Sequence, residues 1–188
     1  ITALKDGGTV VIPSVGAARH AEKVASWGAD AVVIQGGEGG GHTGSVPTTL
    51  LLPTVLDAVD IPVVAAGGFF DGRGLAAALS YGAAGIGMGT RFLLTRESTV
   101  PDAVKQKYLE HGLDGTVVTS KVDGMPHRML RTDLVDELEE TSALKRLAPT
   151  VRRTLEFKRL SRMTWRQLLA DGRSMRRGGD RSWAQMMV

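Results

Sequence analysis

Short apolar runs alternate with amphipathic stretches along the first part of the chain. Residues 9–15 and 31–35 are rich in β-branched and apolar side chains, as expected of strands, and residues 17–28 between them place apolar side chains at helical spacing. Gly28 ends the expected helix and leads into the second strand, as is typical of a tight connection from helix to strand. The pattern therefore predicts a β-α-β unit.

The same pattern recurs twice. Residues 47–59 predict a helix with Pro47 in its first turn, and residues 61–66 predict a buried parallel strand. Residues 73–81 and 82–89 predict the next helix and strand. The phrases WGADAVVIQG and YGAAGIGMGT repeat one order of helix end, glycine, strand and loop, which is typical of repeated β/α units.

These repeats predict an α/β fold. A closed barrel of eight β/α units usually takes ~250 residues. We therefore expect a (β/α)8 TIM barrel of which this chain holds the C-terminal four β/α units in residues 1–100, followed by a helical region with a basic tail in residues 101–188. A half barrel would leave open strand edges, and the chain begins at Ile1, so we expect a fragment rather than a barrel completed by a partner.

The C-terminal part has a different pattern. Residues 101–110 and 133–147 predict helices, residues 115–122 predict a strand, and residues 150–170 predict a basic amphipathic helix. Residues 141–188 contain 12 Lys and Arg against three acidic residues, a net charge of +9, whereas residues 1–140 contain 11 basic and 17 acidic residues, a net charge of −6.

This charge has several interpretations. Arginines at helical spacing more often form a solvated face or a contact in a homo-oligomer than a nucleic-acid site, and no helix-turn-helix, zinc or aromatic RNA-binding signature accompanies them, so we expect no nucleic-acid partner. A further hypothesis is that the tail binds the phosphates of an acyl-CoA, through Arg152, Arg153, Arg176 and Arg177.

Composition narrows the class of protein. The chain has 188 residues and 43% hydrophobic content, enough for a sizeable core. The sequence has no apolar run near the roughly 18 residues of a membrane span, so we expect a cytoplasmic protein that does not enter membranes. It contains no cysteine, which excludes disulfides, thiolate catalysis and cysteine-ligated metals, and we expect no metal site.

The first candidate site is the segment QGGEGGGHTG, residues 35–44, directly after an expected strand. Its glycines allow backbone amides to approach a flat or anionic ligand closely, and in a barrel this loop would lie on the C-terminal face, where active sites occur. His42 can take up or release a proton near neutral pH. The alternative is a flexible surface loop with an incidental histidine, because His20, His111 and His127 are expected in a helix, at a helix end and in a turn. Glu38 could orient His42 or be a solvated carboxylate.

Two further glycine segments, residues 65–74 and 85–91, also follow expected strands. A strand that ends in paired glycines before a helix presents free N–H groups and a favourable dipole to a phosphate. No dinucleotide fingerprint or Walker loop is present, which favours a mononucleotide such as FMN. A phosphate-binding isomerase or synthase without flavin would share these two segments but would not need the loop with His42.

The segments VVIQGGEGGGHTG, IPVVAAGGFFDGRGLAAALSYGA and GIGMGTRFLLTRES, together with GMPHRMLRT, resemble the nitronate monooxygenase family in order and spacing over residues 7–131. The resemblance implies a TIM barrel that binds FMN, with His42 as the catalytic base. It implies that Gln35, Gly39 and Gly40 lie near the flavin, although Gly39 stands where the family usually has alanine. The residues that would hold the flavin phosphate are Gly67, Gly68, Gly89 and Thr90.

The resemblance also implies an activity on a small molecule. The expected reaction is oxidative denitrification of nitronates or nitroalkanes with O2. The alternative is a flavin-dependent dehydrogenase or reductase that acts on an acyl-CoA thioester in steroid-ring catabolism, because residues 156–188 resemble actinobacterial members of the fold family linked to that pathway.

Overall fold

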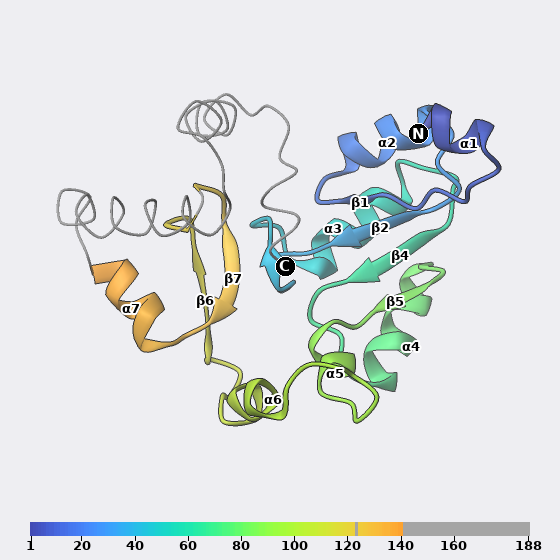
Figure 1. Cartoon of the computed structure of the whole chain (residues 1–188). Coiled ribbons are helices and arrows are strands. Elements are labelled where there is room, and N and C mark those ends of the chain that lie inside the picture. The colour runs from blue at the N-terminus through green and yellow to red at the C-terminus, as the bar shows by residue number, and fades with distance from the viewer. Residues whose placement is uncertain (123, 141–188) are drawn as a thin grey trace. The chain divides into compact units, whose positions relative to one another are not determined.

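Four parallel strands, each followed by a helix, occupy residues 14–93 in the computed structural model, which describes residues 1–122 and 124–140 (Figure 1). The strand order is β1-β2-β4-β5, so neighbours in the sheet follow one another along the chain. The elements are β1 (Ser14–Val15), α2 (Ala18–Ser26), β2 (Val32–Gln35), α3 (Thr48–Leu56), β4 (Val63–Ala66), α4 (Gly72–Tyr81), β5 (Gly85–Gly87) and α5 (Thr90–Leu93). The four predicted β/α units and the α/β class are confirmed.

The strands are shorter than the apolar runs that predicted them. Val33 N–H donates to Pro13 O at 2.9 Å and Val32 N–H donates to Pro62 O at 2.9 Å. Because proline has no N–H group to return, β1 and β4 begin only after these prolines. The first residues of each apolar run therefore lie beside the sheet and outside its regular ladder of hydrogen bonds.

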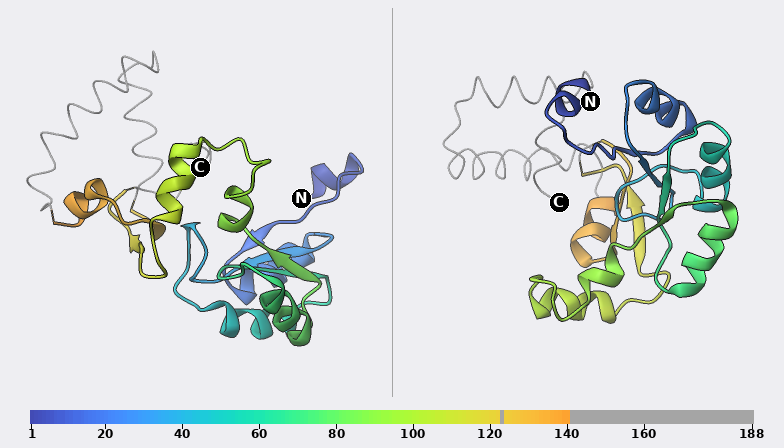
Figure 2. Two further views of the ribbon diagram at one scale, coloured as in Figure 1. Left: turned by 90° about the horizontal axis from the view of Figure 1, so that it is seen from below. Right: turned by 90° about the vertical axis from the view of Figure 1, so that its right-hand side faces the viewer.

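The hydrophobic core lies between the sheet and its helices. Val32 and Ile34 of β2, and Val63 of β4, are fully buried, while the alternate residues of both strands are half-buried on the other face. Figure 2 shows α2, α3 and α4 along the same face of the sheet. The other buried members of the core cluster are Val15, Ala21, Leu51, Leu52, Val55, Ala65, Ala78 and Ala83.

A second, antiparallel sheet has the strand order β3-β7-β6. It consists of β3 (Gly41–His42), β6 (Thr116–Thr119) and β7 (His127–Leu130). The expected strand at residues 115–122 is confirmed in its central part. The expectation that His127 lies in a turn is wrong, because His127 begins β7, and His42 lies in a strand rather than in a free loop.

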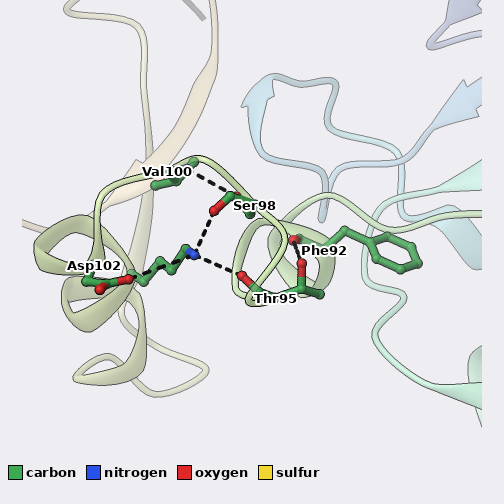
Figure 3. A network of polar contacts seen from close by, with 6 residues as sticks. Phe92, Thr95, Ser98, Val100 and Asp102 are labelled. Carbon is green, nitrogen blue, oxygen red and sulfur yellow. Dashed lines mark hydrogen bonds and ion pairs between the residues drawn. The ribbon is translucent and has the colours of Figure 1, made fainter.

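The segment between α5 and α6 (Asp102–Leu109) is held by a lysine from α6. Lys105 Nζ donates to Thr95 O at 2.8 Å and to Ser98 O at 2.9 Å. Val100 N–H donates to the Ser98 hydroxyl oxygen at 3.3 Å, and the network is seen in Figure 3. The segment that follows Thr90 is therefore anchored by side-chain hydrogen bonds to its carbonyl oxygens.

The chain divides into two compact units, Ile1–Arg131 and Thr132–Val188. The first begins with helix α1 (Thr2–Asp6), and the described part of the second contains α7 (Asp133–Glu140). Three predicted features lie outside the described residues: the helix at residues 150–170, residues 141–147 of the helix at 133–147, and the basic tail with its hypothesis of CoA binding. The predicted domain boundary at residue 100 also stays a prediction. No described helix is both long and apolar enough to span a bilayer.

Candidate active site

The C-terminal ends of three parallel strands lie side by side. Gln35 at the end of β2 pairs with Ala66 at the end of β4, and Ala66 pairs with Gly87 at the end of β5. Each of these residues belongs to one of the three glycine segments found in the sequence, residues 35–44, 65–74 and 85–91. The sheet therefore brings all three segments to one edge, as the sequence predicted.

The side chain of Gln35 holds the loop that carries His42. Gln35 Nε2 donates to Gly40 O at 3.1 Å and to His42 O at 2.8 Å. A Cβ atom on Gly39 would lie 2.5 Å from Gln35 Cγ and 2.6 Å from Gln35 Nε2. Glycine at position 39, in place of the alanine expected from the resemblance, leaves the space in which Gln35 makes these two bonds.

Glu38 binds the start of the next helix and not His42. Its carboxylate accepts hydrogen bonds from Thr48 N–H at 2.9 Å and from the Thr48 hydroxyl at 2.8 Å. Desolvation opposes ionisation of Glu38, but the hydrogen bonds from Thr48 and the positive charge of Arg128 outweigh it and lower the pKa of this carboxyl. Glu38 thus serves as an anionic cap for α3 rather than orienting His42, and its side chain is also exposed to solvent, as the second sequence-based interpretation expected.

Thr48 joins two of the glycine segments, and the sequence analysis missed it. Its side chain is buried, and its hydroxyl lies 3.0 Å from Gly67 O as well as near Glu38. A Cβ atom on Gly36 would lie 2.0 Å from Thr48 Oγ1, and one on Gly67 would lie 3.0 Å from the same atom. The only sequence signal was a threonine directly after Pro47, where hydroxyl residues often begin helices.

His42 faces a second histidine. Strand β3 pairs with β7 so that His42 lies directly opposite His127. The two imidazole ring centroids are 3.6 Å apart, with 47° between the ring planes. The sequence analysis singled out His42 alone, since nothing local relates the glycine loop to the distant segment GMPHRMLRT.

Arg128, the next residue of β7, clamps the glycine loop. Its Nε and Nη2 atoms donate to Gly37 O at 3.2 and 2.9 Å, and Nη1 donates to the Thr116 hydroxyl oxygen at 2.9 Å. A guanidinium group that donates two hydrogen bonds to one carbonyl oxygen fixes both the position and the direction of that carbonyl. Arg128 was also missed by the sequence analysis.

Comparison with known proteins identifies the family. A family model described as nitronate monooxygenase matches residues 1–176. The chain belongs to the nitronate monooxygenase family. Its four β/α units are part of the TIM barrel of this family of flavin-dependent oxidoreductases, as the sequence predicted.

Individual relatives differ in their named activities. The chain is 65% identical to a Mycobacterium tuberculosis protein named (3aS,4S,5R,7aS)-5-hydroxy-7a-methyl-1-oxo-octahydro-1H-indene-4-carboxyl-CoA dehydrogenase, over 100% of this chain and 54% of that protein. It is 42% identical to a probable nitronate monooxygenase of Staphylococcus haemolyticus, over 60% of this chain and 35% of that protein. The solved structure of FabK from Thermotoga maritima is similar, with a TM-score of 0.75 and 41% identity over 86% of this chain and 51% of that one. The chain spans about half the length of the curated relatives it matches.

In this member of the nitronate monooxygenase family, the remaining predicted positions follow β4 and β5. Gly67 and Gly68 have φ angles of 101° and 80°, which favour glycine. Gly89 and Thr90 lie where α5 begins, and a Cβ atom on Gly89 would meet nothing within 4 Å. The start of α4, expected to present free N–H groups, is instead capped by Asp71, which accepts from Arg73 N–H at 3.0 Å. A phosphate at this edge would therefore rely on the glycine backbone rather than on the first turn of α4.

Proposed function

We propose that the whole protein binds FMN and oxidises a hydroxyl group on a bicyclic acyl-CoA thioester. The observation that carries this proposal is the identity of 65% over all of this chain with a relative named as the dehydrogenase of such a compound. Relatives named as probable nitronate monooxygenases match only about 60% of the chain, at 37–42% identity. The dehydrogenase reading was the alternative from the sequence, and this difference in identity favours it.

The glycine backbone at the strand ends supports the proposal that the cofactor is a flavin mononucleotide. Backbone without side chains lies at the ends of β4 and β5, where Gly67, Gly68 and Gly89 would hold the phosphate together with the Thr90 hydroxyl. Gly67 is so closely packed that a Cβ atom would lie 3.1 Å from Gly39 N. Gln35, Gly39 and Gly40 lie on the neighbouring loop and would border the flavin ring.

The cofactor and three side chains of this chain would have separate roles in the reaction. FMN, when bound, supplies an acceptor for the hydrogen that leaves the substrate carbon as hydride. His42 would take the proton of the substrate hydroxyl, because an imidazole exchanges protons near neutral pH. Gln35 and Arg128 hold the loop that carries His42, through the carbonyl oxygens of His42 and Gly37. Such fixed positioning is the main contribution that a protein makes beside a cofactor.

The second candidate function is nitronate monooxygenase. It is favoured by the family model over residues 1–176 and by the Staphylococcus relatives. There His42 would remove the proton next to the nitro group of a nitroalkane, or hold a nitronate that is already an anion, and O2 would be the second substrate.

The test is an absorbance spectrum of the purified whole protein, followed by two anaerobic titrations. Flavin bands that are bleached by a hydroxylated bicyclic acyl-CoA, and not by a nitronate, would support the dehydrogenase. Bleaching by the nitronate alone would favour the second candidate. A protein without flavin bands that also takes up no added FMN would refute both, and would favour a phosphate-binding barrel enzyme without flavin.

A further inference from the structure

We propose that His127 is a positioning residue that orients the imidazole ring of His42 for proton transfer. This inference rests on the proposed function, in which His42 is the proton acceptor, and it adds a residue that the sequence analysis had placed in a turn.

The backbone of His42 is fixed on several sides. Gln35 Nε2 donates to His42 O at 2.8 Å, and Thr43 N–H donates to Pro126 O at 3.0 Å. The pairing of β3 with β7 adds the register of His42 with His127. The side-chain torsions of His42 decide where its ring nitrogens point.

The ring of His127 packs against that of His42 and limits this rotation. Residues directly opposite in an antiparallel pair project to the same face of the sheet. The ring centroids of His42 and His127 are 3.6 Å apart, within van der Waals contact, so His42 cannot rotate toward β7 without a clash. His42 is half-buried, so one side of its ring is packed while solvent or a ligand can reach it from another side.

His127 also has a neighbour on the other side, on strand β6. It lies directly opposite Thr119 of β6, which is 3% exposed. His42, His127 and Thr119 therefore form one row across the three strands, closed at its inner end by a buried residue. A ring held between a buried threonine and a second ring has little room to move, so it provides a rigid surface for His42.

The position of an acid or base matters because proton transfer depends steeply on geometry. A displacement of about 1 Å can lower a rate ~100-fold. If His127 acts through ring packing, removing its ring should lower kcat while the KM for substrate and the affinity for FMN stay nearly unchanged. An aromatic ring without the imidazole nitrogens should restore most of the turnover.

The experiment compares His127→Ala and His127→Phe in the whole flavin-loaded enzyme, each in the wild-type and the His42→Ala background. We expect His127→Ala to lower kcat by ~10- to 100-fold, His127→Phe to recover most of that loss, and His127→Ala to have no further effect once His42 is alanine. Leu130→Ala is the matched control, because Leu130 lies on the same strand with its side chain on the opposite face from His127. Its kcat should stay near that of the wild type, and the flavin spectrum of each variant reports whether the site has folded.

The outcomes separate this inference from the proposed function. Equal losses from His127→Ala in both backgrounds, no recovery with His127→Phe, or the same loss in Leu130→Ala would overturn the role of His127 and leave His42 as the base. Unchanged turnover in His42→Ala would remove the base from the proposed function, and the role of His127 with it.

Discussion

The carboxylate of Glu38 accepts hydrogen bonds from both the backbone N–H and the side-chain hydroxyl of Thr48, the first residue of α3. The loop after β2 therefore returns to cap the helix that follows it. The same Thr48 hydroxyl lies 3.0 Å from Gly67 O, beyond the end of the neighbouring strand β4. Two of the three glycine segments are thus connected through one buried threonine.

Replacing Glu38 by Gln should destabilise the protein by about 1 kcal/mol at neutral pH, the typical value of a helix cap. Glu38 is exposed, so solvent screens part of its charge and the effect should stay at that level. Because the pKa of Glu38 is lowered in the folded protein, its charged form contributes stability above the unfolded pKa of about 4.3, and this contribution is lost as the pH falls through the folded pKa. Urea denaturation of the wild type and Glu38→Gln at pH 7 and pH 4 would measure both effects.

Glu22→Gln, an exposed substitution within α2, is the control for loss of a carboxylate without loss of a cap. Its stability should match that of the wild type at both pH values. A difference between wild type and Glu38→Gln that grows rather than narrows toward pH 4 would contradict the assignment.

The main sheet could be predicted from sequence because its signals are local. Each β/α unit is encoded by one apolar run and one helical stretch, and two of the helices are followed by a glycine, such as Gly82 with its φ angle of 105° at the end of α4. In the second sheet only β6 had such a signal, in the β-branched residues of the run 115–122. Strand β3 contains only two residues, and its pairing with β7 depends on contacts between segments far apart in sequence. Propensity within a short window cannot detect such a pairing.

The residues of the candidate site likewise fall into two groups, those that the sequence could single out and those that it could not. Gln35, His42 and the glycines stand in strand-end segments whose composition is unusual, so they could be singled out. Thr48, His127 and Arg128 are ordinary residue types in ordinary surroundings, and their importance follows only from what they contact. Glu38 was noticed, but its partner could not be inferred, since a carboxylate near a histidine and a carboxylate near a helix start look alike in sequence.

Arg128→Lys should weaken flavin binding about 10- to 100-fold. A lysine cannot reproduce the two donors to Gly37 O together with the third to Thr116, and hydrogen bonds from charged groups contribute about 1.5–3 kcal/mol. Fluorescence titration of the apoprotein with FMN would measure the change. Arg73→Lys is the control, because Arg73 is an exposed partner of Asp71. An equal loss of FMN affinity in Arg73→Lys would show that any exchange of arginine for lysine has this effect, and that the bonds of Arg128 to Gly37 and Thr116 are not its cause.

Gly39→Ala should destabilise the protein by about 1–3 kcal/mol, because the added Cβ would displace Gln35 and leave the carbonyl oxygens of Gly40 and His42 without their donor. Adding Gln35→Ser, which shortens the side chain, should make Gly39→Ala nearly harmless. Gly44→Ala is the matched control in the same loop, since a Cβ atom there would meet nothing within 4 Å. Thermal unfolding of Gly39→Ala, Gln35→Ser, the double variant and Gly44→Ala would test the explanation, which requires that the losses at positions 35 and 39 are not additive.

His111 should titrate above its ordinary range. Its ring nitrogens lie 2.6 Å from Lys107 O and 2.9 Å from Arg131 O, and these carbonyl oxygens raise the pKa by favouring the doubly protonated ring. A raised folded pKa gives stability that is fully present below the unfolded pKa of about 6.5 and is lost as the pH rises through the folded value. NMR titration of the ring would measure the pKa, and His111→Asn should reduce the stability difference between pH 6 and pH 8. His20→Asn in the exposed face of α2 should leave that difference as it is.

Lys105→Met should destabilise the segment between α5 and α6 by about 1–3 kcal/mol, because methionine keeps the apolar stem but leaves Thr95 O and Ser98 O without their charged donor. The side chain of Lys105 is only 12% exposed, so water cannot readily replace that donor, whereas the ion pair with the fully exposed Asp102 at 4.0 Å should contribute little.

Lys107→Met on the same helix is the control. It removes a lysine that is 67% exposed and 3.8 Å from Glu110, and it should have almost no effect. Hydrogen exchange of the Val100 amide, which donates to Ser98, would locate the change. Faster exchange in Lys105→Met alone is the expected result, and equal exchange in both variants would mean that the lysine does not hold this segment.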